Sequence, residues 1–520
     1  MRPILFVLFV SFLFSQEHVH PLYFDMLDKQ VLQSEISHAD AIYAKFRYVF
    51  GEGKKEGGDI VKCLTPLIRD YNYYRNTMSA EAITFIESKL NRSKQKKLAS
   101  TYISPSGRFR INYETSGPDA VSPTDENTNT IPDYVESVAE FFDYSFNAEV
   151  SIGGYRDPIL SGEKYEVYLE NLGFGFYGFT DDDGTTTSIT IHNNFIGFPP
   201  NTDPDGNELG AAKVTVAHEF KHAIQFASDP IQWYGPEYWV ELDAVWAEEF
   251  VYDEVNDYYN YLTSNSCQIT NPALRLNDIV NSGSYYDVIW DIYLTQTHGN
   301  QILNQFWTRR ELQNGESVLN TYSVVLQQNG SNFNKAIREY TTWNFMTGNR
   351  ATPQYGYEEA EFYPASTIYN QIEFQNDSLF SGTINPFASR HYSLEIRDAL
   401  YPRFELNGDA NLDLVMVVKL ETGSVKTFTL NGNSALTINF SLEQVAEFGI
   451  LPIGITPTGP LQNYEFKVTY SGQLDLDSKL FAIFKASING GMEINHNIIE
   501  IGTATEYTVF NLLGQTIKRG

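Results

Sequence analysis

The longest regular patterns in the chain have the period of an α-helix. Apolar residues recur three and four positions apart in Tyr134–Ala148, Val214–Phe226 and Glu237–Phe250. The same spacing occurs earlier in Ser79–Leu90 and later in Ser284–Gly299, where a glycine ends the pattern. These segments predict that the first hundred residues and the centre of the chain are mostly helical.

Strand patterns occupy other parts of the chain. Alternating apolar and polar residues predict strands at Ser104–Tyr113, Lys164–Glu170 and Thr187–Asn193. Four short apolar runs separated by Gly and Asn turns predict a C-terminal β-sandwich: Leu412–Leu420, Lys426–Leu430, Ala435–Phe440 and Tyr464–Tyr470. The whole chain is therefore expected to be an α+β protein.

Composition narrows the class of protein. The 520 residues are 42% hydrophobic, enough for a sizeable core, and their length suggests two to four domains. The formal net charge of −29 argues against a nucleic-acid partner and against an anionic membrane surface, since both would repel the chain. Such acidity suits a secreted protein, including one that holds calcium.

The N-terminus carries the pattern of a secretory signal. Met1–Gln16 has one early positive charge and an apolar run of about eleven residues, too short to span a bilayer. No other stretch approaches the length of a transmembrane helix, so we expect no transmembrane segment and an extracellular or cell-surface location.

The helix predicted at Val214–Phe226 carries residues that can bind a metal ion. His218 and His222 are four residues apart and therefore lie on one face of a helix, where both imidazoles can bind one metal ion. Glu219 lies about 100° round the same turn, close enough to act on a water without being a ligand. Polar residues at the edge of a core are the structural alternative.

The next predicted helix offers a third ligand. Eighteen residues separate His222 from Glu241, whose carboxylate can complete the metal site if the two helices pack together. Glu248 follows two turns later and can hydrogen-bond a ligating histidine.

The spacing H-E-x-x-H, eighteen residues, then Glu resembles that of the gluzincin metallopeptidases, and Trp239–Ala244 (WVELDA) is similar to their W-x-N-E-G-x-A segment. The resemblance implies a zincin-like domain of strands followed by helices. It also implies a zinc hydrolase that cleaves peptide bonds, with His218, His222 and Glu241 on the zinc and Glu219 as general base.

The sequence departs from the family pattern beside the third ligand. Val240 replaces the Asn, and Leu242-Asp243 replaces the Gly and its neighbour, so the pocket beside the zinc is expected to differ. By the same resemblance a Tyr or His stabilises the oxyanion, and Tyr285 is preferred over Tyr286 for this role.

The strand at Thr187–Asn193 precedes the H-E-x-x-H helix, where zincins carry the edge strand that pairs with an extended peptide. His192, on this strand, is expected to be an exposed polar residue and not a ligand.

A second cation site is predicted in the loop before Tyr134. Its oxygen-bearing side chains stand at alternate positions and suit calcium, although such residues are also common in turns: Asp125, Asn127, Asn129 and Asp133. This loop and the strand at Ser104–Tyr113 together resemble the segments that precede the zinc helix in a group of secreted bacterial metalloproteases.

The two cysteines, Cys63 and Cys267, allow three interpretations. They form a disulfide, they are unpaired structural thiols, or Cys63 caps the zinc in a latent precursor. The third interpretation fits the basic cluster Arg92–Lys97, which is either a solvated helix end or a processing site.

The C-terminal residues, with a Leu-Gly-Gln turn at 513–515, resemble the sorting domain of type IX secretion substrates and imply the secretion machinery as a partner. The expected parts are a signal peptide (1–16), a helical propeptide-like region (17–100), the metalloprotease domain (101–346), a linker (347–375), a β-sandwich (376–475) and a sorting-like tail (476–520).

The resulting hypothesis is a secreted zinc endopeptidase that acts on a protein or peptide substrate. The alternative is a secreted surface-binding or adhesion protein built on a catalytically degenerate metalloprotease scaffold. The altered residues around Glu241 and the β-rich C-terminus favour this alternative.

Overall fold

The computed structural model separates the chain into two compact units. One contains residues 1–367 with 455–458, and the other contains 368–454 with 459–520. The described residues are 22–51, 61–90, 100–173, 176–182, 186–229, 239–263, 265–276, 285–313, 315–373, 378–395, 401–438, 442–471, 483–486, 492–495, 498–501, 507–510 and 516–519. The predicted signal Met1–Gln16 and the basic cluster Arg92–Lys97 lie outside them.

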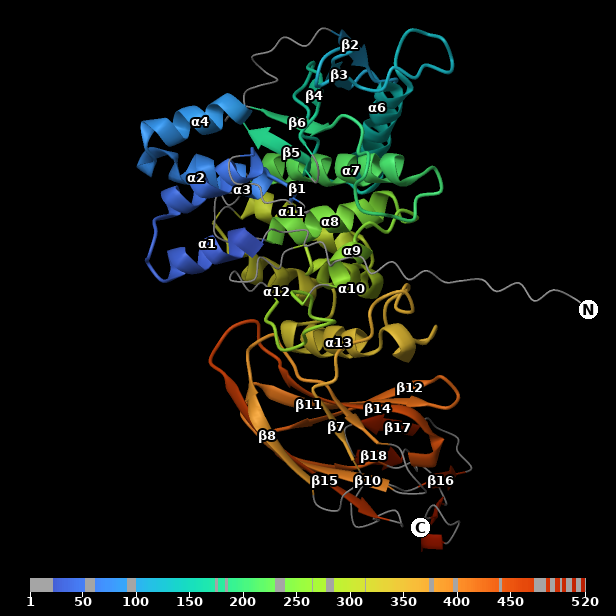
Figure 1. The fold of residues 1–520 in the computed structure, drawn as a ribbon. Coiled ribbons are helices and arrows are strands. Elements are labelled where there is room, and N and C mark those ends of the chain that lie inside the picture. The colour runs from blue at the N-terminus through green and yellow to red at the C-terminus, as the bar shows by residue number, and fades with distance from the viewer. Residues whose placement is uncertain are drawn as a thin grey trace, which may run out of the picture. The chain divides into compact units, whose positions relative to one another are not determined.

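The N-terminal region of the first unit is helical, as its apolar spacing predicted (Figure 1). The Ser37 side chain caps its second helix by accepting from the Asp40 N–H, and Pro66 stands in the first turn of the third. Its elements are α1 (Leu22–Leu32), α2 (His38–Val49), β1 (Val61–Cys63), α3 (Thr65–Tyr74), η1 (Arg75–Thr77) and α4 (Ala80–Leu90). Their apolar faces form one core, which also includes Phe176 and Phe179 of the sheet.

The sheet of the first unit has six strands in the order β1-β5-β6-β4-β3-β2. β1 pairs parallel with β5, β5 antiparallel with β6, and β6, β4 and β3 run parallel. Besides β1, its strands are β2 (Ser100–Ile103), β3 (Phe109–Tyr113), β4 (Tyr165–Glu170), β5 (Phe176–Asp182) and β6 (Thr187–His192).

The prediction of the edge strand was wrong. The strand at Thr187–His192 is β6, which lies inside the sheet, while β5 lies outside it and is itself covered by β1. The sequence analysis predicted no strand at β5, because nearly all its side chains are buried and the sequence does not alternate between apolar and polar residues.

Helices pack against this sheet and against one another. In Figure 1, α7 runs below the sheet and α8 lies beneath α7. The helical elements, which include one π-type segment, are α6 (Asp133–Phe146), η2 (Asn147–Ile152), α7 (Asn207–Ser228), α8 (Trp239–Val251), α9 (Tyr259–Leu262), α10 (Val288–His298), α11 (Gln301–Leu312), α12 (Val318–Gln328), α13 (Phe333–Phe345) and η5 (Gly348–Arg350).

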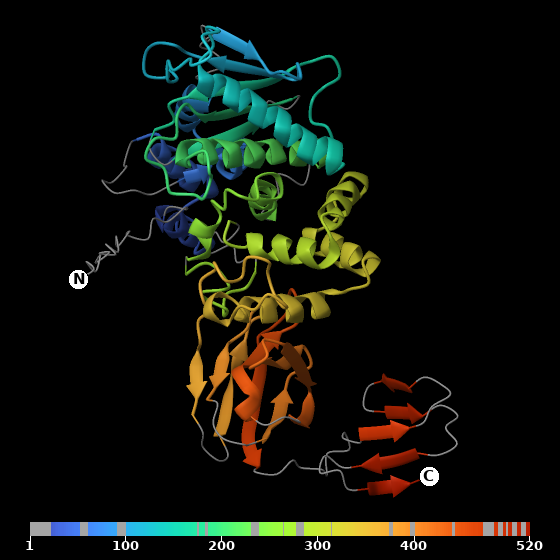
Figure 2. The same cartoon turned by 90° about the vertical axis from the view of Figure 1, so that its right-hand side faces the viewer.

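The second unit begins at Ile368, inside the predicted linker, and is a β-sandwich (Figure 2). Its two sheets have the orders β13-β10-β15-β8 and β12-β11-β14-β9-β7, and their inner faces share one core. The elements are β7 (Asn370–Ile372), β8 (Ser378–Ile384), β9 (Tyr392–Leu394), β10 (Tyr401–Gly408), β11 (Leu412–Leu420), β12 (Val425–Asn431), β13 (Asn433–Thr437), η6 (Leu442–Gln444), β14 (Val445–Gly454) and β15 (Gln462–Ser471).

Short strands follow in the C-terminal tail: β16 (Ile483–Ala486), β17 (Met492–Asn495), β18 (Ile498–Ile501), β19 (Tyr507–Phe510) and β20 (Thr516–Arg519). The fold is thus α+β, as predicted. Among the helices that the structure describes, none has the length and apolar character needed to cross a bilayer.

The core beneath the N-terminal helices gives a stability prediction. Phe46 is 0% exposed, whereas Leu32 of the same region is 59% exposed. Phe46→Ala should lower the free energy of unfolding by about 3–5 kcal/mol, because the buried ring leaves a cavity. Leu32→Ala should change it by less than about 0.5 kcal/mol. Urea unfolding of both full-length variants, followed by tryptophan fluorescence, measures the difference, and equal losses would contradict the assignment of this core.

Candidate metal centre

Two imidazole rings meet on the buried face of α7. His218 and His222 are both 0% exposed, and their Nε2 atoms lie 3.1 Å apart. The two residues are one helical turn apart, so the helix itself directs both rings to one point. Two facing ring nitrogens at this distance are the arrangement of ligands around a shared cation.

Glu241 of α8 completes a triangle with the two histidines. Its Oε1 lies 3.1 Å from His222 Nε2, and its Oε2 lies 3.3 Å from His218 Nε2. Zinc bonds to nitrogen and oxygen of about 2.0–2.1 Å place tetrahedral ligand atoms about 3.3 Å apart. The three donors therefore fit a zinc ion by both chemistry and spacing.

Side chains behind the rings fix their orientation. Glu248 Oε1 lies 2.8 Å from His218 Nδ1, and Gln225 Oε1 lies 2.8 Å from His222 Nδ1. When Nδ1 donates to these oxygens, Nε2 keeps its lone pair for a metal. Sequence analysis identified Glu248 but missed Gln225, although its position three residues after His222 on the same helix was a usable signal.

The unusual residue Asp243 extends this network. Its Oδ2 accepts hydrogen bonds from Gln225 Nε2 at 2.6 Å and from Trp307 Nε1 at 2.8 Å. The Leu242-Asp243 departure from the family pattern therefore places a carboxylate behind Gln225 and links α8 to α11.

The two carboxylate oxygens of Glu219 have different surroundings. Its Oε2 accepts from Thr180 Oγ1 at 2.8 Å and from Thr65 Oγ1 at 3.2 Å. Its Oε1 is buried and has no hydrogen-bond partner among the described residues. The structure thus holds one oxygen of a buried carboxylate in place and leaves the other available.

The fourth donor in this group is Cys63 of β1. Its sulfur and one ligand atom each from His218, His222 and Glu241 all lie within 4.8 Å of one another, and all four residues are buried. The two cysteines are not paired with each other, so the disulfide interpretation is not supported; Cys63 and Cys267 are separate buried thiols. Three nitrogen and oxygen donors with one sulfur form a closed donor set for zinc.

Tyr285 also reaches this group. Its hydroxyl donates to the main-chain oxygen of Cys63 at 3.4 Å, and its ring stacks on that of His218 with centroids 6.2 Å apart. Tyr286 is buried too.

Burial and mutual contacts shift the pKa values of the group. Burial lowers the pKa of His218, but contacts with Glu241 and Glu248 outweigh it and raise that pKa to about 10. Burial also opposes ionisation of Glu241, yet the facing imidazoles hold its pKa below the usual range. Burial, then the charges of Glu219 and Glu241, raise the pKa of the Cys63 thiol. Burial and Glu241 likewise raise the pKa of Tyr285.

The predicted calcium loop lies elsewhere in the first unit. The Asp125 carboxylate accepts from the Asn129 and Thr130 N–H groups, and the Asp133 carboxylate accepts from the Glu126 N–H. The side-chain amides of Asn127 and Asn129 both donate to Glu136. These bonds explain the loop as a network of turns, and calcium there stays a prediction.

The expectation for His192 was wrong. The residue is 5% exposed, its Nδ1 accepts from the N–H groups of Asn194 and Phe195, and burial lowers its pKa to about 4. Its strand, β6, lies inside the sheet, so the side chain is a buried acceptor.

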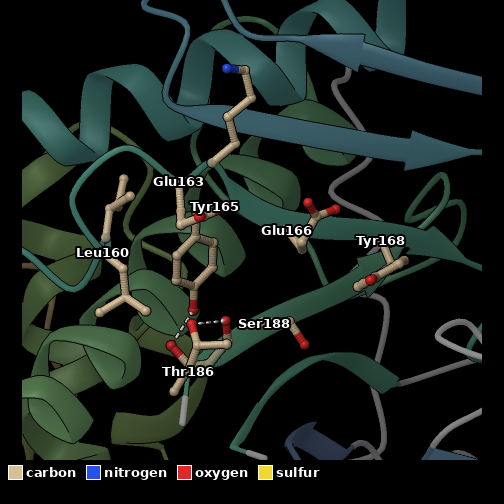
Figure 3. Close-up of a pocket in the computed structure, with 10 residues that line it drawn as sticks. Leu160, Glu163, Tyr165, Glu166, Tyr168, Thr186 and Ser188 are labelled. Carbon is tan, nitrogen blue, oxygen red and sulfur yellow. Dashed lines mark hydrogen bonds between the residues drawn. The ribbon is translucent and has the colours of Figure 1, made fainter.

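A surface pocket of about 520 Å³ opens where β4 and β6 begin (Figure 3). It is lined by Leu160, Glu163 and Glu166 among others, and the Tyr165 hydroxyl lies 2.7 Å from Thr187 Oγ1. None of the four candidate metal donors lines it, so it is separate from the metal centre.

Comparison with known proteins leaves the centre to be judged on its own geometry. No family model matches the chain, and no curated protein matches it. A periplasmic inhibitor of g-type lysozyme from Aeromonas hydrophila aligns at 10% identity and a TM-score of 0.17, over 20% of this chain and 96% of that one. The Yersinia pseudotuberculosis-derived mitogen aligns at 12% identity and 0.16, over 20% and 92%. Likenesses this low carry no argument.

The donor geometry predicts the metal content. Purified full-length protein should contain about one zinc ion per chain, and Glu241→Ala made in a Cys63→Ser background should lose most of it, because the two imidazoles that then remain hold zinc weakly. Glu254→Ala is the matched control, since Glu254 is exposed on the segment after the same helix. Elemental analysis after exhaustive dialysis measures both, and full zinc retention by Glu241→Ala would remove that residue from the site.

Proposed function

We propose that this protein is a secreted zinc-dependent endopeptidase of the gluzincin type, with a zincin-like catalytic domain in the first unit. One observation carries the proposal: three candidate metal donors converge in a buried site beside a carboxylate oxygen, Glu219 Oε1, that has no hydrogen-bond partner among the described residues. The sheet and the two helices that bring these residues together support it.

Each residue has a distinct task in the proposed reaction. His218, His222 and Glu241 would hold zinc, which supplies a Lewis acid that polarises the scissile carbonyl and makes a water more acidic. Glu219 accepts the proton of the attacking water on Oε1 and passes it to the leaving amine. Tyr285 is placed to donate a hydrogen bond to an oxygen beside the site.

The position of Glu219 favours an enzyme over a binding protein on a degenerate scaffold. A carboxylate that only supported the fold would be expected to pair with a cation or fill both oxygens with donors. Glu219 instead receives two hydroxyl groups on one oxygen and none on the other among the described residues. Such incomplete satisfaction is typical of functional sites.

We further propose that the described form of the chain is latent, because Cys63 occupies the fourth position around the metal. The sulfur lies within the donor group, and Thr65 of the same segment donates to Glu219. A thiolate on the metal leaves no position for a water, and Glu219 then has nothing to activate.

Latency predicts a gain of activity from a small change. Full-length Cys63→Ser should hydrolyse unfolded casein at least about tenfold faster than the uncut native chain, because a serine hydroxyl is a weak zinc ligand and the segment that covers β5, without its bond to the metal, gives way to substrate more often. Cys267→Ser, a change at the other buried thiol, should leave the rate unchanged. A spectroscopic readout is independent of activity: the cobalt-loaded chain should show thiolate-to-cobalt absorption that Cys63→Ser removes and Cys267→Ser keeps. Its presence in Cys63→Ser would contradict the assigned contact.

The general-base role is tested in the same background. Glu219→Gln added to Cys63→Ser should lower the rate by about 10²–10⁴-fold while the zinc content stays constant, because the amide cannot accept the proton. A chelator should abolish activity in Cys63→Ser. Undiminished hydrolysis by the double variant would rule out Glu219 as the base, and absence of hydrolysis from every variant would favour the binding protein.

A further inference from the structure

Lys62 is a deeply buried cation that contacts the surroundings of the metal centre. Its side chain is 1% exposed, and its Nζ lies 2.7 Å from Asp257 Oδ2 and 3.2 Å from Glu248 Oε2. Two carboxylates therefore face one ammonium group in a site closed to solvent.

Aromatic rings complete the surroundings of this ammonium group. Nζ lies 4.3 Å from the centre of the Tyr177 ring and 5.7 Å from that of Tyr261. The Tyr261 hydroxyl donates to the same Asp257 oxygen at 2.9 Å and so fixes the carboxylate. Paired carboxylates with ring faces recognise an extended basic side chain, since the rings accept its methylene groups and its charge.

The segment that carries Lys62 lies where the proposed enzyme would bind a peptide. Val61 and Cys63 pair with β5, and the Leu64 N–H donates to the Gly178 oxygen at 3.3 Å. The Cys63 carbonyl accepts from Tyr285, and Thr65 contacts the Glu219 carboxylate. One extended stretch of chain thus contacts the strand edge, the hydroxyl that donates to a carbonyl and the proposed general base.

Departure of this segment would leave an uncompensated charge. Asp257 and Glu248 are both buried, and Asp257 Oδ1 has no hydrogen-bond partner among the described residues. Two buried carboxylates without their cation are strongly unfavourable. Whatever peptide replaces the segment is therefore favoured if it brings a positive charge to the same place.

We propose that the space filled by Lys62 is a substrate subsite that selects lysine or arginine, and that Asp257 is its specificity-determining residue. The inference rests on the proposed peptidase function. It goes beyond that function by naming the substrate class: peptides with a basic residue close to the bond that is cut.

Binding to this subsite can be measured without any hydrolysis. Lys62→Ala removes the atoms from Cγ to Nζ, which n-propylammonium matches in length and charge. With n-propylammonium well above its dissociation constant, the melting temperature of full-length Lys62→Ala should rise by about 2–4 °C. Neutral 1-propanol should not raise it, and neither compound should raise that of the native chain. A response to the amine no larger than that to the alcohol would overturn the inference.

Selection among substrates is the second measurement. Full-length Lys62→Ala/Cys63→Ser frees both the subsite and the metal, and is offered peptide pairs that differ only by lysine or norleucine at one position. At one position the lysine peptide should be favoured by about 100-fold in kcat/KM. Adding Asp257→Asn should reduce that ratio by at least about tenfold. Because the ratio compares two substrates of the same variant, differences in folding or metal content between variants cancel.

The outcomes separate this inference from the proposed function. Hydrolysis without preference for lysine at any position overturns the subsite, even if the amine stabilises Lys62→Ala, because Lys62 would then serve only to anchor its segment. Absence of all hydrolysis overturns the peptidase proposal and with it the subsite. If Lys62→Ala does not fold, the lysine-to-norleucine ratio is measured in Lys62→Ser/Cys63→Ser instead, because the short serine side chain also leaves the space free and its hydroxyl can donate to a carboxylate.

Discussion

The contact of the Glu241 carboxylate with two imidazole rings is the constraint on which the centre of the first unit depends. It joins α7 to α8 at a point where all three side chains are buried and both carboxylate oxygens lack ordinary hydrogen bonds. Without a metal ion the buried carboxylate is balanced by a protonated imidazole, and with one the three side chains become a cross-link between two helices. Metal binding and the stability of this helix pair are therefore expected to be coupled.

The edge of the sheet at β5 depends on β1. β5 is antiparallel to β6 and would present its unpaired N–H and C=O groups if β1 did not cover it. An exposed edge beside hydrophobic residues invites pairing with another chain. The same three residues that protect this edge bring Cys63 to the metal donors and Lys62 to Asp257. Protection of the fold and closure of the site thus depend on one short strand.

The sequence predicts contacts between residues that are close together in the chain and misses contacts between residues that are far apart in it. His218, Glu219 and His222 share one helix, and Glu241 follows within one connection, so periodicity and spacing suffice to predict them. Thr180 on β5 and Thr65 at the start of α3 reach Glu219 from positions far away in the chain, and no local pattern indicates them. β5 lacks alternation because both its faces are covered, which is also why the exposure of His192 on β6 was misjudged.

The roles of some other residues become clear only from their contacts in the structure. Asp243 differs from the family pattern, yet it accepts from Gln225 and Trp307 and so has a clear structural task. The sequence left three interpretations of Cys63 open. The structure shows an unpaired thiol, which argues against the disulfide, and the position of Cys63 among the donors supports the proposal that it caps the metal. Lys62, adjacent to it, gave no signal at all, since a lysine in a charged region reads as a solvated side chain.

The short length of β1 bears on how the segment that carries Cys63 would be released from the proposed metal site. Its pairing with β5 involves only Val61 and Cys63 as registered partners, so main-chain pairing alone holds the segment weakly. Attachment to the same chain compensates, because a tethered segment acts at an effective concentration on the order of millimolar. A break in the connecting chain converts this hold into an ordinary bimolecular equilibrium. If the freed piece is then diluted, dilution alone would make the opening of the proposed site irreversible.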